Sequence, residues 1–273
     1  MRRLLNIRPG RGGRLALGAV PLISLSLVYL FASETRHALY GAEKILPTLG
    51  QMTDAIHMMA FQIDPLRGTV PLVVDTAASL ERLSLALIIA TATTLVLGVT
   101  LGLLPAMRTS LGPAIAAIAV IPPIAVLPIL FITLGLGETA KIALIVIGIT
   151  PVMTRDLIAH VAAIPQEQLI KAQTLGASTW QIALRVALPQ TWPRLIDSLR
   201  LSLCPAWVYL ISAEAIASDV GLGYRIFLVR RYLAMDIILP YVAWISLLAV
   251  LLDIALAQFS RRAFPWAHGP RHA

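Results

Sequence analysis

The feature that most constrains the fold is a series of long apolar runs, separated by short polar segments. A transmembrane α-helix needs about 20 consecutive, mostly apolar residues to cross the hydrocarbon core of a bilayer. The sequence therefore predicts an all-α membrane protein with six transmembrane helices and no strands. The runs lie at about residues 15–31, 82–104, 113–134, 141–160, 198–217 and 237–259.

Composition supports a membrane protein over a nucleic-acid-binding one. Of the 273 residues, 58% are hydrophobic and 13% are charged, and the mean hydropathy is +0.82. Soluble domains carry about 25% charged residues. The net charge of +8 could indicate nucleic acid, but the arginines cluster at the ends of apolar runs, as in membrane orientation. The single cysteine, Cys204, lies inside an apolar run and is interpreted as a packing residue.

The distribution of charge divides the chain into segments. We expect a basic cytoplasmic tail (1–14), a first transmembrane helix (15–31), an acid-rich extracytoplasmic segment (32–75), a helical core (76–262) and a cytoplasmic tail (263–273). The basic start followed by the 15–31 run could instead be a signal peptide. Since no clear small-residue cleavage site follows, a retained helix is favoured.

Arginine placement sets the orientation. Cytoplasmic flanks of membrane helices are enriched in Lys and Arg, so both termini and the loop 161–193 are predicted to be cytoplasmic. Arg225, Arg230 and Arg231 do not fit this rule, because they fall on the predicted outer side. One hypothesis is that Arg230 and Arg231 meet acidic residues of a partner. The arginines that define the inside are Arg2, Arg3, Arg8, Arg11, Arg14, Arg261, Arg262 and Arg271.

Prolines interrupt three of the runs, at Pro122-Pro123 and Pro128, at Pro151 and at Pro205. Each proline removes a backbone hydrogen bond. In lipid such breaks are tolerated where they are buried in protein or line a wet cavity, so they favour a packed bundle with a pathway. The alternative is that prolines are simply common in membrane helices.

The loop 161–193 predicts two short helices joined by a sharp corner. Pro165 suits a first helical position, and Leu169, Ala172 and Leu175 recur at helical spacing. Gly176 is placed to end this helix in a left-handed conformation. Ser178, three residues before Gln181, can cap the next helix. A short amphipathic helix held by a fixed corner is a docking element for a cytoplasmic partner.

The spacing within this loop resembles a known family. Gly176, then nine intervening residues, then Val186-x-Leu188-Pro189, is similar to the second part of the cytoplasmic "EAA" loop in permeases of binding-protein-dependent ABC importers. The chain departs from the family at the acidic-Ala-Ala triplet, where it has Ile170-Lys171-Ala172 and only the last alanine matches. The role of the acidic residue is therefore not carried over, although Glu167 lies almost one turn earlier.

The resemblance covers about residues 46–266 and looks like the nitrate/sulfonate/taurine/bicarbonate branch of this family. Within the branch, the chain is most similar to members associated with urea-carboxylase or guanidine-utilisation systems. The matching segments are Leu46-Pro47, Ile121-Pro122-Pro123 with Leu127-Pro128, Leu134 to Lys141, Leu175 to Ser178, Ala213 to Tyr224 and Ser260 to Trp266.

The resemblance implies a type I ABC importer permease (MetI-like) fold in the bacterial inner membrane. It also implies a homodimer, a separate cytoplasmic ATP-binding subunit, a periplasmic solute-binding protein, and a permease core (76–262) with the coupling loop at 161–193. The chain has no G-x-x-x-x-G-K-[ST] motif, so ATP is expected on the partner and no cofactor on this chain. The expected ATPase-coupling residues are Gln168, Leu169, Lys171, Ala172, Leu175 and Gly176.

Candidates for the solute pathway are polar or aromatic residues near the proline breaks. Glu214 is singled out because an acid within a membrane span is a functional candidate; it would suit guanidinium and not nitrate or a sulfonate. Alternatively, Glu214 is an interfacial residue that is hydrated or paired with Arg225. The full candidate set is Thr150, Ser202, Trp207, Tyr209 and Glu214.

Other titratable groups predict no catalytic or metal site. Asp156 and His160 are four residues apart, but no third ligand is nearby. Asp253 is expected to find an interhelical partner or to extend towards the inner surface.

The principal alternative is an autonomous secondary transporter or channel, which would need no docking loop. An intramembrane enzyme is disfavoured, since the sequence contains no HExxH or G-x-S-x-G motif.

Overall fold

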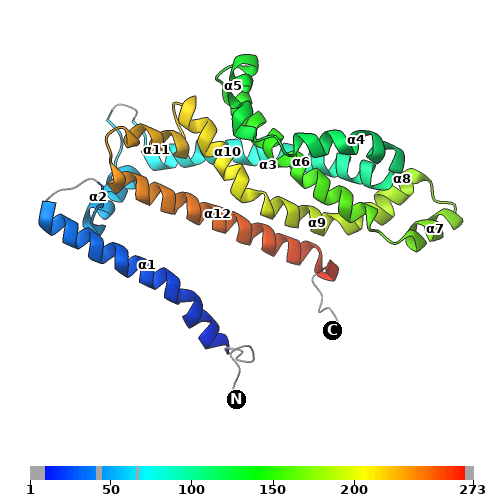
Figure 1. Cartoon of the computed structure of the whole chain (residues 1–273), viewed down its shortest axis with the longest axis horizontal. Helices are drawn as coiled ribbons and strands as arrows, with labels where there is room; N and C mark the ends of the chain where they lie inside the picture. Colours follow the sequence, from blue (N-terminus) through cyan, green and yellow to red (C-terminus); the bar gives the residue numbers. More distant parts are fainter. Residues whose placement is uncertain (1–9, 41–44, 66–67, 268–273) are drawn as a thin grey trace. The chain divides into compact units, whose positions relative to one another are not determined.

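The computed structural model describes residues 10–40, 45–65 and 68–267, and in these ranges the regular structure is entirely helical (Figure 1). The chain divides into two compact units. The first comprises Met1–Gln62 with Val229–Pro240, and the second comprises Ile63–Leu228 with Tyr241–Ala273. The all-α prediction is therefore confirmed for the described part of the chain.

The first unit contains α1 (Arg11–Tyr40) and α2 (Leu49–Phe61). The hydroxyl groups of Tyr29 and Ser33 on α1 donate to the carbonyl of Pro47, at 2.8 and 3.0 Å, so the turn before α2 lies against α1. Thr48 and Gln51 form a capping box that begins α2. Helix α1 extends beyond the predicted 15–31 run to Tyr40, so the first part of the polar segment 32–75 is helical.

The second unit contains the remaining helices, and both α11 and α12 also include residues of the first unit. Pro71 occupies the first turn of α3, where its missing N–H costs no hydrogen bond. The helices are α3 (Pro71–Leu103), α4 (Pro105–Ile118), α5 (Pro123–Leu134), α6 (Glu138–Ala162), α7 (Gln166–Thr174), α8 (Thr179–Ile182), a π-helix (Ala183–Ala187), α9 (Leu188–Leu201), α10 (Leu203–Ile216), α11 (Leu222–Arg230), α12 (Met235–Ala263) and a 3-10 turn (Pro265–Ala267).

In the described part of the chain, four helices are long and apolar enough to cross a membrane, namely α1, α3, α6 and α12. Two bent pairs raise the total to six if each pair is one span: α4 with α5, bent by 93°, and Thr179–Leu201 with α10, bent by 45°. The number of predicted crossings thus agrees with the structure when the bent pairs are counted as spans.

The third and fifth predicted runs, 113–134 and 198–217, are each divided between two helices near a proline. Pro122 precedes α5 and Pro123 is its first residue, so the run 113–134 is divided between α4 and α5 (Figure 1). Pro205 cannot bond the carbonyl of Leu201, and α9 ends at that residue.

Small residues allow α3 and α6 to pack closely. A Cβ atom at Gly98 would lie 2.6 Å from Cδ2 of Leu157, and one at Gly102 would overlap Val161. Gly98 and Gly102 are one turn apart, so this contact is a small-xxx-small packing face. Its close approach positions α3 beside the loop that follows α6.

The contact between Gly98 and Leu157 predicts the direction in which an alanine substitution changes the unfolding temperature. Alanine normally stabilises a helix relative to glycine by about 0.8–1 kcal/mol. Gly98→Ala should nevertheless lower the unfolding temperature in detergent, because its Cβ overlaps Leu157 and overpacking costs about 1–3 kcal/mol. Gly18→Ala on α1, where no atom lies within 4 Å of the new Cβ, should leave the temperature unchanged or raise it. A stabilised Gly98→Ala variant would contradict this account.

Candidate functional site: a coupling loop and a buried polar network

The loop after α6 forms the predicted helix-corner-helix. Gly176 has φ of +80°, the left-handed conformation that side chains disfavour, and nothing lies within 4 Å of the position of its Cβ. Ser178 and Gln181 form the predicted capping box of α8. Pro165 differs by one position, since it is the N-cap and α7 begins at Gln166. The local prediction from this sequence is therefore confirmed almost residue by residue.

One face of α7 packs on the helical core. Leu169 contacts a buried cluster formed by Val161, Ile164 and Ala187, and the side-chain amide of Gln168 accepts a hydrogen bond from Gln190 on α9 at 3.1 Å. Of the predicted coupling residues, Leu169 and Ala172 are half-buried, whereas Gln168, Lys171, Leu175 and Gly176 are exposed. Leu169 thus attaches α7 to the ends of α6 and the π-helix.

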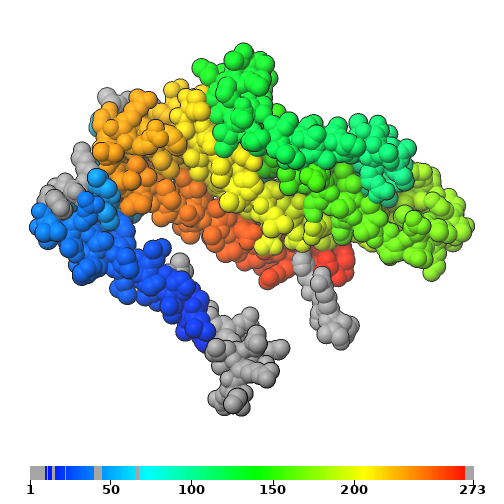
Figure 2. All heavy atoms as spheres, viewed as in Figure 1, coloured from blue at the N-terminus to red at the C-terminus, as the bar shows by residue number. Residues whose placement is uncertain are grey.

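Three large apolar side chains of this segment are accessible at the surface. Leu175 is 85% exposed, Trp180 is 71% exposed and Ile170 is 54% exposed. Figure 2 shows the yellow-green segment containing α7 and α8 at one end of the second unit. The sequence analysis missed Ile170 and Trp180, because it assigned the docking face by the spacing of Leu169, Ala172 and Leu175 alone. We call Ile170, Leu175 and Trp180 the docking patch.

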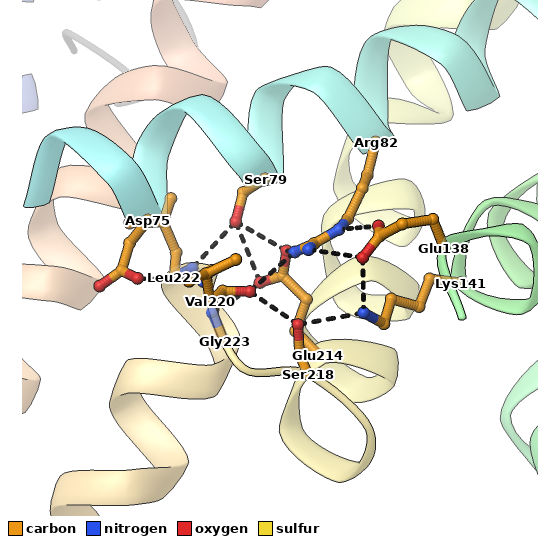
Figure 3. A network of polar contacts seen from close by, with 11 residues as sticks. Asp75, Ser79, Arg82, Glu138, Lys141, Glu214, Ser218, Val220, Leu222 and Gly223 are labelled. Carbon is orange, nitrogen blue, oxygen red and sulfur yellow. Dashed lines mark hydrogen bonds and ion pairs between the residues drawn. The ribbon is translucent and has the colours of Figure 1, made fainter. Parts of the chain in front are cut away.

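A second site is a buried polar network centred on Glu214 (Figure 3). Glu214 on α10 has no exposed surface. Its carboxylate accepts hydrogen bonds from Ser79 Oγ at 2.8 Å, from Arg82 Nη1 at 2.7 Å and from the backbone N–H of Gly223 at 2.8 Å. The sequence analysis considered Arg225 as a partner, but Glu214 pairs with Arg82 on α3. The buried charge is therefore compensated within the subunit.

Arg82 links this carboxylate to a second one at the start of α6. Its Nε and Nη2 donate to the two oxygens of Glu138, whose side chain is half-exposed. Glu138 also accepts from Lys141 Nζ at 2.9 Å, and Lys141 donates further to Ser218 Oγ at 3.1 Å. Arg82 is thus held between a buried and a half-exposed carboxylate, and Lys141 between Glu138 and Ser218, which joins α3, α6 and α10 (Figure 3).

Asp75 forms an adjoining set of contacts one to two turns earlier on α3. It is fully buried and accepts from Arg225 Nε at 2.8 Å, from Tyr241 Oη at 3.2 Å and from the backbone N–H of Gly221 at 3.0 Å. Burial alone would lower the pKa of Arg225, but its hydrogen bond to Asp75 and the charge of that carboxylate raise the pKa above its ordinary value. Asp75, placed by the sequence in a polar outer segment, is therefore an interior residue of α3.

The glycines after α10 are required by this network. Gly221 has φ of +133°, and its Cβ would lie 2.6 Å from the carboxylate of Glu214. A Cβ at Gly223 would lie 2.7 Å from the carbonyl oxygen of Ile211. Only glycine lets the backbone approach closely enough for these N–H groups to reach Asp75 and Glu214, which explains the run Ala213 to Tyr224 noted in the sequence.

The pathway candidates lie mostly inside the subunit. Thr150, Ser202, Trp207 and Glu214 are buried, and Tyr209 is half-buried against Gly148. The hydroxyl of Thr150 and Nε1 of Trp207 have no hydrogen-bond partner, whereas Ser202 bonds the carbonyl of Ser198 at 2.9 Å. The structure does not gather these five side chains into one cluster.

The two other acids considered in the sequence, Asp156 and Asp253, form ion pairs. Asp156 accepts two hydrogen bonds from Arg194, and Asp253 accepts two from Arg200. Asp253 thus has the interhelical partner expected for it. Among the described residues there is no group of three or more His, Cys, Asp or Glu side chains suited to a metal ion.

Comparison with known proteins identifies the family. Residues 94–265 match the family described as "Binding-protein-dependent transport system inner membrane component". The chain belongs to this family. The resemblance noted in the sequence, including the nitrate/sulfonate/taurine branch, is therefore confirmed.

Individual relatives support this family assignment. The taurine transport system permease protein TauC of Escherichia coli K12 is 38% identical over 193 residues, covering 71% of this chain and 70% of the relative. The nitrate import permease NrtB of Leptolyngbya laminosa is 26% identical over 190 residues, covering 69% and 68%.

Solved structures confirm the MetI-like fold. A chain of the MetNI methionine ABC transporter in an inward-facing conformation superposes with a TM-score of 0.60 at 20% identity, covering 68% of this chain and 92% of that chain.

Removing the buried charge tests the network. Glu214→Gln leaves Arg82 without its buried counter-ion, and breaking such a pair costs about 3–5 kcal/mol, so the unfolding temperature in detergent should fall strongly. Glu81→Gln, an exposed neighbour on α3, should have little effect. The double variant Glu214→Gln with Arg82→Met should recover part of the loss, because no uncompensated charge remains. Equal stability of the two single variants would refute this role of Glu214.

Proposed function

We propose that this family member is the membrane-spanning permease subunit of an ATP-driven importer. Two copies form a homodimer, a separate ATPase binds the coupling loop, and a periplasmic binding protein delivers the solute. The subunit crosses the inner membrane six times with both termini in the cytoplasm. The observation that carries the proposal is the docking patch on a rigid corner at Gly176.

The docking patch supports a protein partner on physical grounds. Exposed apolar patches are uncommon on protein surfaces in contact with water and mark interaction sites. Leu175 projects beside the open left-handed turn at Gly176, and nothing in the described structure covers it. Trp is among the residue types that most often supply the binding energy at the centre of an interface, and Trp180 belongs to this patch.

The attachments of α7 allow movement of the patch to reach the membrane helices. Leu169 packs on Val161 at the end of α6 and on Ala187 in the π-helix, while Gln168 bonds Gln190 on α9. A displacement of α7 by the ATPase therefore displaces α6 and α9 together. The π-helix Ala183–Ala187 lies at their junction, and such bulges are frequent at functional sites.

The proposed solute is a small nitrogen- or sulfur-containing molecule. Similarity to the taurine permease favours a taurine-type aminosulfonate, with nitrate as a further option. A guanidine- or urea-type solute is the second candidate. The sequence supported a guanidinium solute because Glu214 could serve as its counter-ion. In the structure Arg82 already pairs with that carboxylate, which weakens this support.

Substitution in the docking patch tests ATPase binding. Leu175→Asp places a charge at the centre of the patch, so we expect a loss of about 2 kcal/mol or more, a roughly 30-fold weaker association. The ATPase should then fail to co-purify in mild detergent. Leu136→Asp provides the matched control, because Leu136 is 67% exposed in the turn between α5 and α6. Retention of the ATPase by Leu175→Asp would contradict the proposed docking site.

Reconstitution discriminates the importer from an autonomous secondary transporter or channel. The purified chain in liposomes should move no solute until the ATPase and ATP are added, because the chain has no phosphate-binding loop of its own. Uptake by the chain alone would refute the proposal.

The ligand that stabilises the binding protein identifies the solute class. We expect an aminosulfonate such as taurine to raise its unfolding temperature by more than guanidine does, since ligand binding stabilises the folded state. The measurement is a thermal melt with each ligand at equal concentration. Protection by guanidine alone would overturn the taurine-type assignment and leave the permease assignment standing.

A further inference from the structure

Helices α3 and α6 carry four threonines whose hydroxyl oxygens are buried and have no hydrogen-bond partner. In the part of the chain that the structure describes, five buried side-chain polar atoms lack a partner, and four of them are threonine Oγ1 atoms. Buried hydroxyl groups almost always have a partner, so four exceptions on two neighbouring helices indicate a missing ligand. The group, which we call the threonine seam, is Thr91, Thr94, Thr150 and Thr154.

The packing register of α3 and α6 brings the threonine seam together. Gly98 faces Leu157, and Gly102 faces Val161 four residues later on both helices, so the two helices run in the same direction. Residues three, four and seven positions apart share one face of a helix. Counting back one turn and two turns from the contact at Gly98 and Leu157 reaches the seam threonines on each helix. The seam therefore lies in the contact between α3 and α6.

Threonines on other helix faces bond their own backbone. Thr93, next to the seam on α3, donates to the carbonyl of Ile89 at 2.8 Å. A hydroxyl group in a helix can therefore be satisfied without any ligand, but the seam hydroxyl groups do not make this bond. The bond to the carbonyl four residues earlier, at 2.6–2.9 Å, is made by Thr35, Thr93, Thr100, Thr109 and Thr133.

A proline adds a backbone acceptor at the same level. Pro151 lies inside α6 and has no N–H, so the carbonyl of Ile147 cannot receive the helical hydrogen bond that residue 151 would normally give. Ile147 lies within one turn of Thr150. In membrane helices, carbonyl groups freed by proline are satisfied by Ser or Thr side chains and by ordered water. The seam thus lies where α6 itself needs an additional donor.

We propose that ordered water molecules occupy the threonine seam and bridge α3 to α6. A buried water makes about three hydrogen bonds to polar groups that otherwise lack partners, and each hydroxyl group can both donate and accept. At Gly98 even one methyl group would overlap Leu157, so the tight contact favours a ligand as small as water. The seam lies inside one subunit, and its occupancy depends neither on the solute nor on the ATPase.

A valine substitution tests whether the seam is hydrated. Thr94→Val removes a hydroxyl group and keeps the shape of the side chain, so a bridged seam loses a hydrogen bond. The unfolding temperature of the full-length chain in detergent should fall by about 2–4 °C. In a dry contact, removal of an unsatisfied hydroxyl group would instead raise this temperature. Thr93→Val, whose hydroxyl group bonds its own helix, is the matched control and should have a smaller effect. A rise with Thr94→Val, or a fall no larger than that of the control, would overturn the proposal.

A double variant tests whether one water bonds both helices. Thr94→Val combined with Thr154→Val should lower the unfolding temperature by less than the sum of the two single changes, because both hydroxyl groups share a ligand. Strictly additive effects would overturn the bridging of α3 to α6.

Met153 reports on the water directly, because it lies between two seam threonines on α6 and is 0% exposed. X-ray irradiation generates hydroxyl radicals from bound water, and these oxidise a neighbouring methionine to its sulfoxide. Mass spectrometry should find Met153 oxidised in the wild-type chain. Leu144→Met, at a fully buried position in an apolar cluster, provides the dry control. Thr150→Val with Thr154→Val should reduce oxidation of Met153 to the level of this control.

The remaining outcomes separate water from the solute. Oxidation of Met153 no greater than that of the dry control would overturn the proposal. Taurine or nitrate added to the wild-type chain should leave the oxidation of Met153 unchanged, and protection by either would overturn resident water in favour of a solute contact. Failure of the proposed function would be observed separately, as absence of the ATPase from the purified complex, and would not alter these results.

Discussion

The carboxylate of Glu214 determines how one end of the helical core is built. A fully buried ionised group is tolerated only when donors replace the water it has lost. Ser79, Arg82 and the N–H of Gly223 supply these donors from two other parts of the chain. Arg82 in turn requires Glu138, and Glu138 engages Lys141. Each charge therefore fixes the position of the next, and α3, α6 and α10 are joined at this end.

The opposite end of the core is organised differently. There α3 and α6 touch through glycines at positions 98 and 102, and the contacts around Leu169 are apolar. Packing of this kind is less directional than a network of hydrogen-bonded ions, so helices can slide by small amounts without breaking a charge pair. The contact between α3 and α6 is therefore held by ions at one end and by apolar packing at the other, while the Asp156–Arg194 pair joins α6 to α9.

The sequence predicted features that depend on local chemistry. The corner at Gly176 and the cap at Ser178 follow from the conformational freedom of glycine and from a three-residue spacing, and the structure has both. The start of α3 could not be found in this way. Asp75 and Arg82 interrupt the apolar pattern, and their partners, Arg225 and Glu214, are more than 130 residues away. Hydropathy counts such residues as polar, although the fold neutralises them.

Helix α7 shows the same limit of prediction from local sequence. Leu169 and Ile170 are neighbours in the sequence, and helical spacing alone assigned Leu169 to the partner-binding side. Because the cluster of Val161, Ile164 and Ala187 covers Leu169, Ile170 is left at the surface. Periodicity therefore predicted an amphipathic helix, but only the position of the neighbouring helices decides which apolar residues remain free for a partner.

Arg225 explains part of the exception to the orientation rule. The positive-inside rule is a statistical excess of basic residues in cytoplasmic segments, and Arg225 lies on the predicted outer side. In the structure its guanidinium donates to the buried Asp75, which also accepts from Tyr241. The charge of Arg225 is therefore compensated by a residue of α3. Arg225 therefore has a structural role at this position, and its presence there is compatible with cytoplasmic termini.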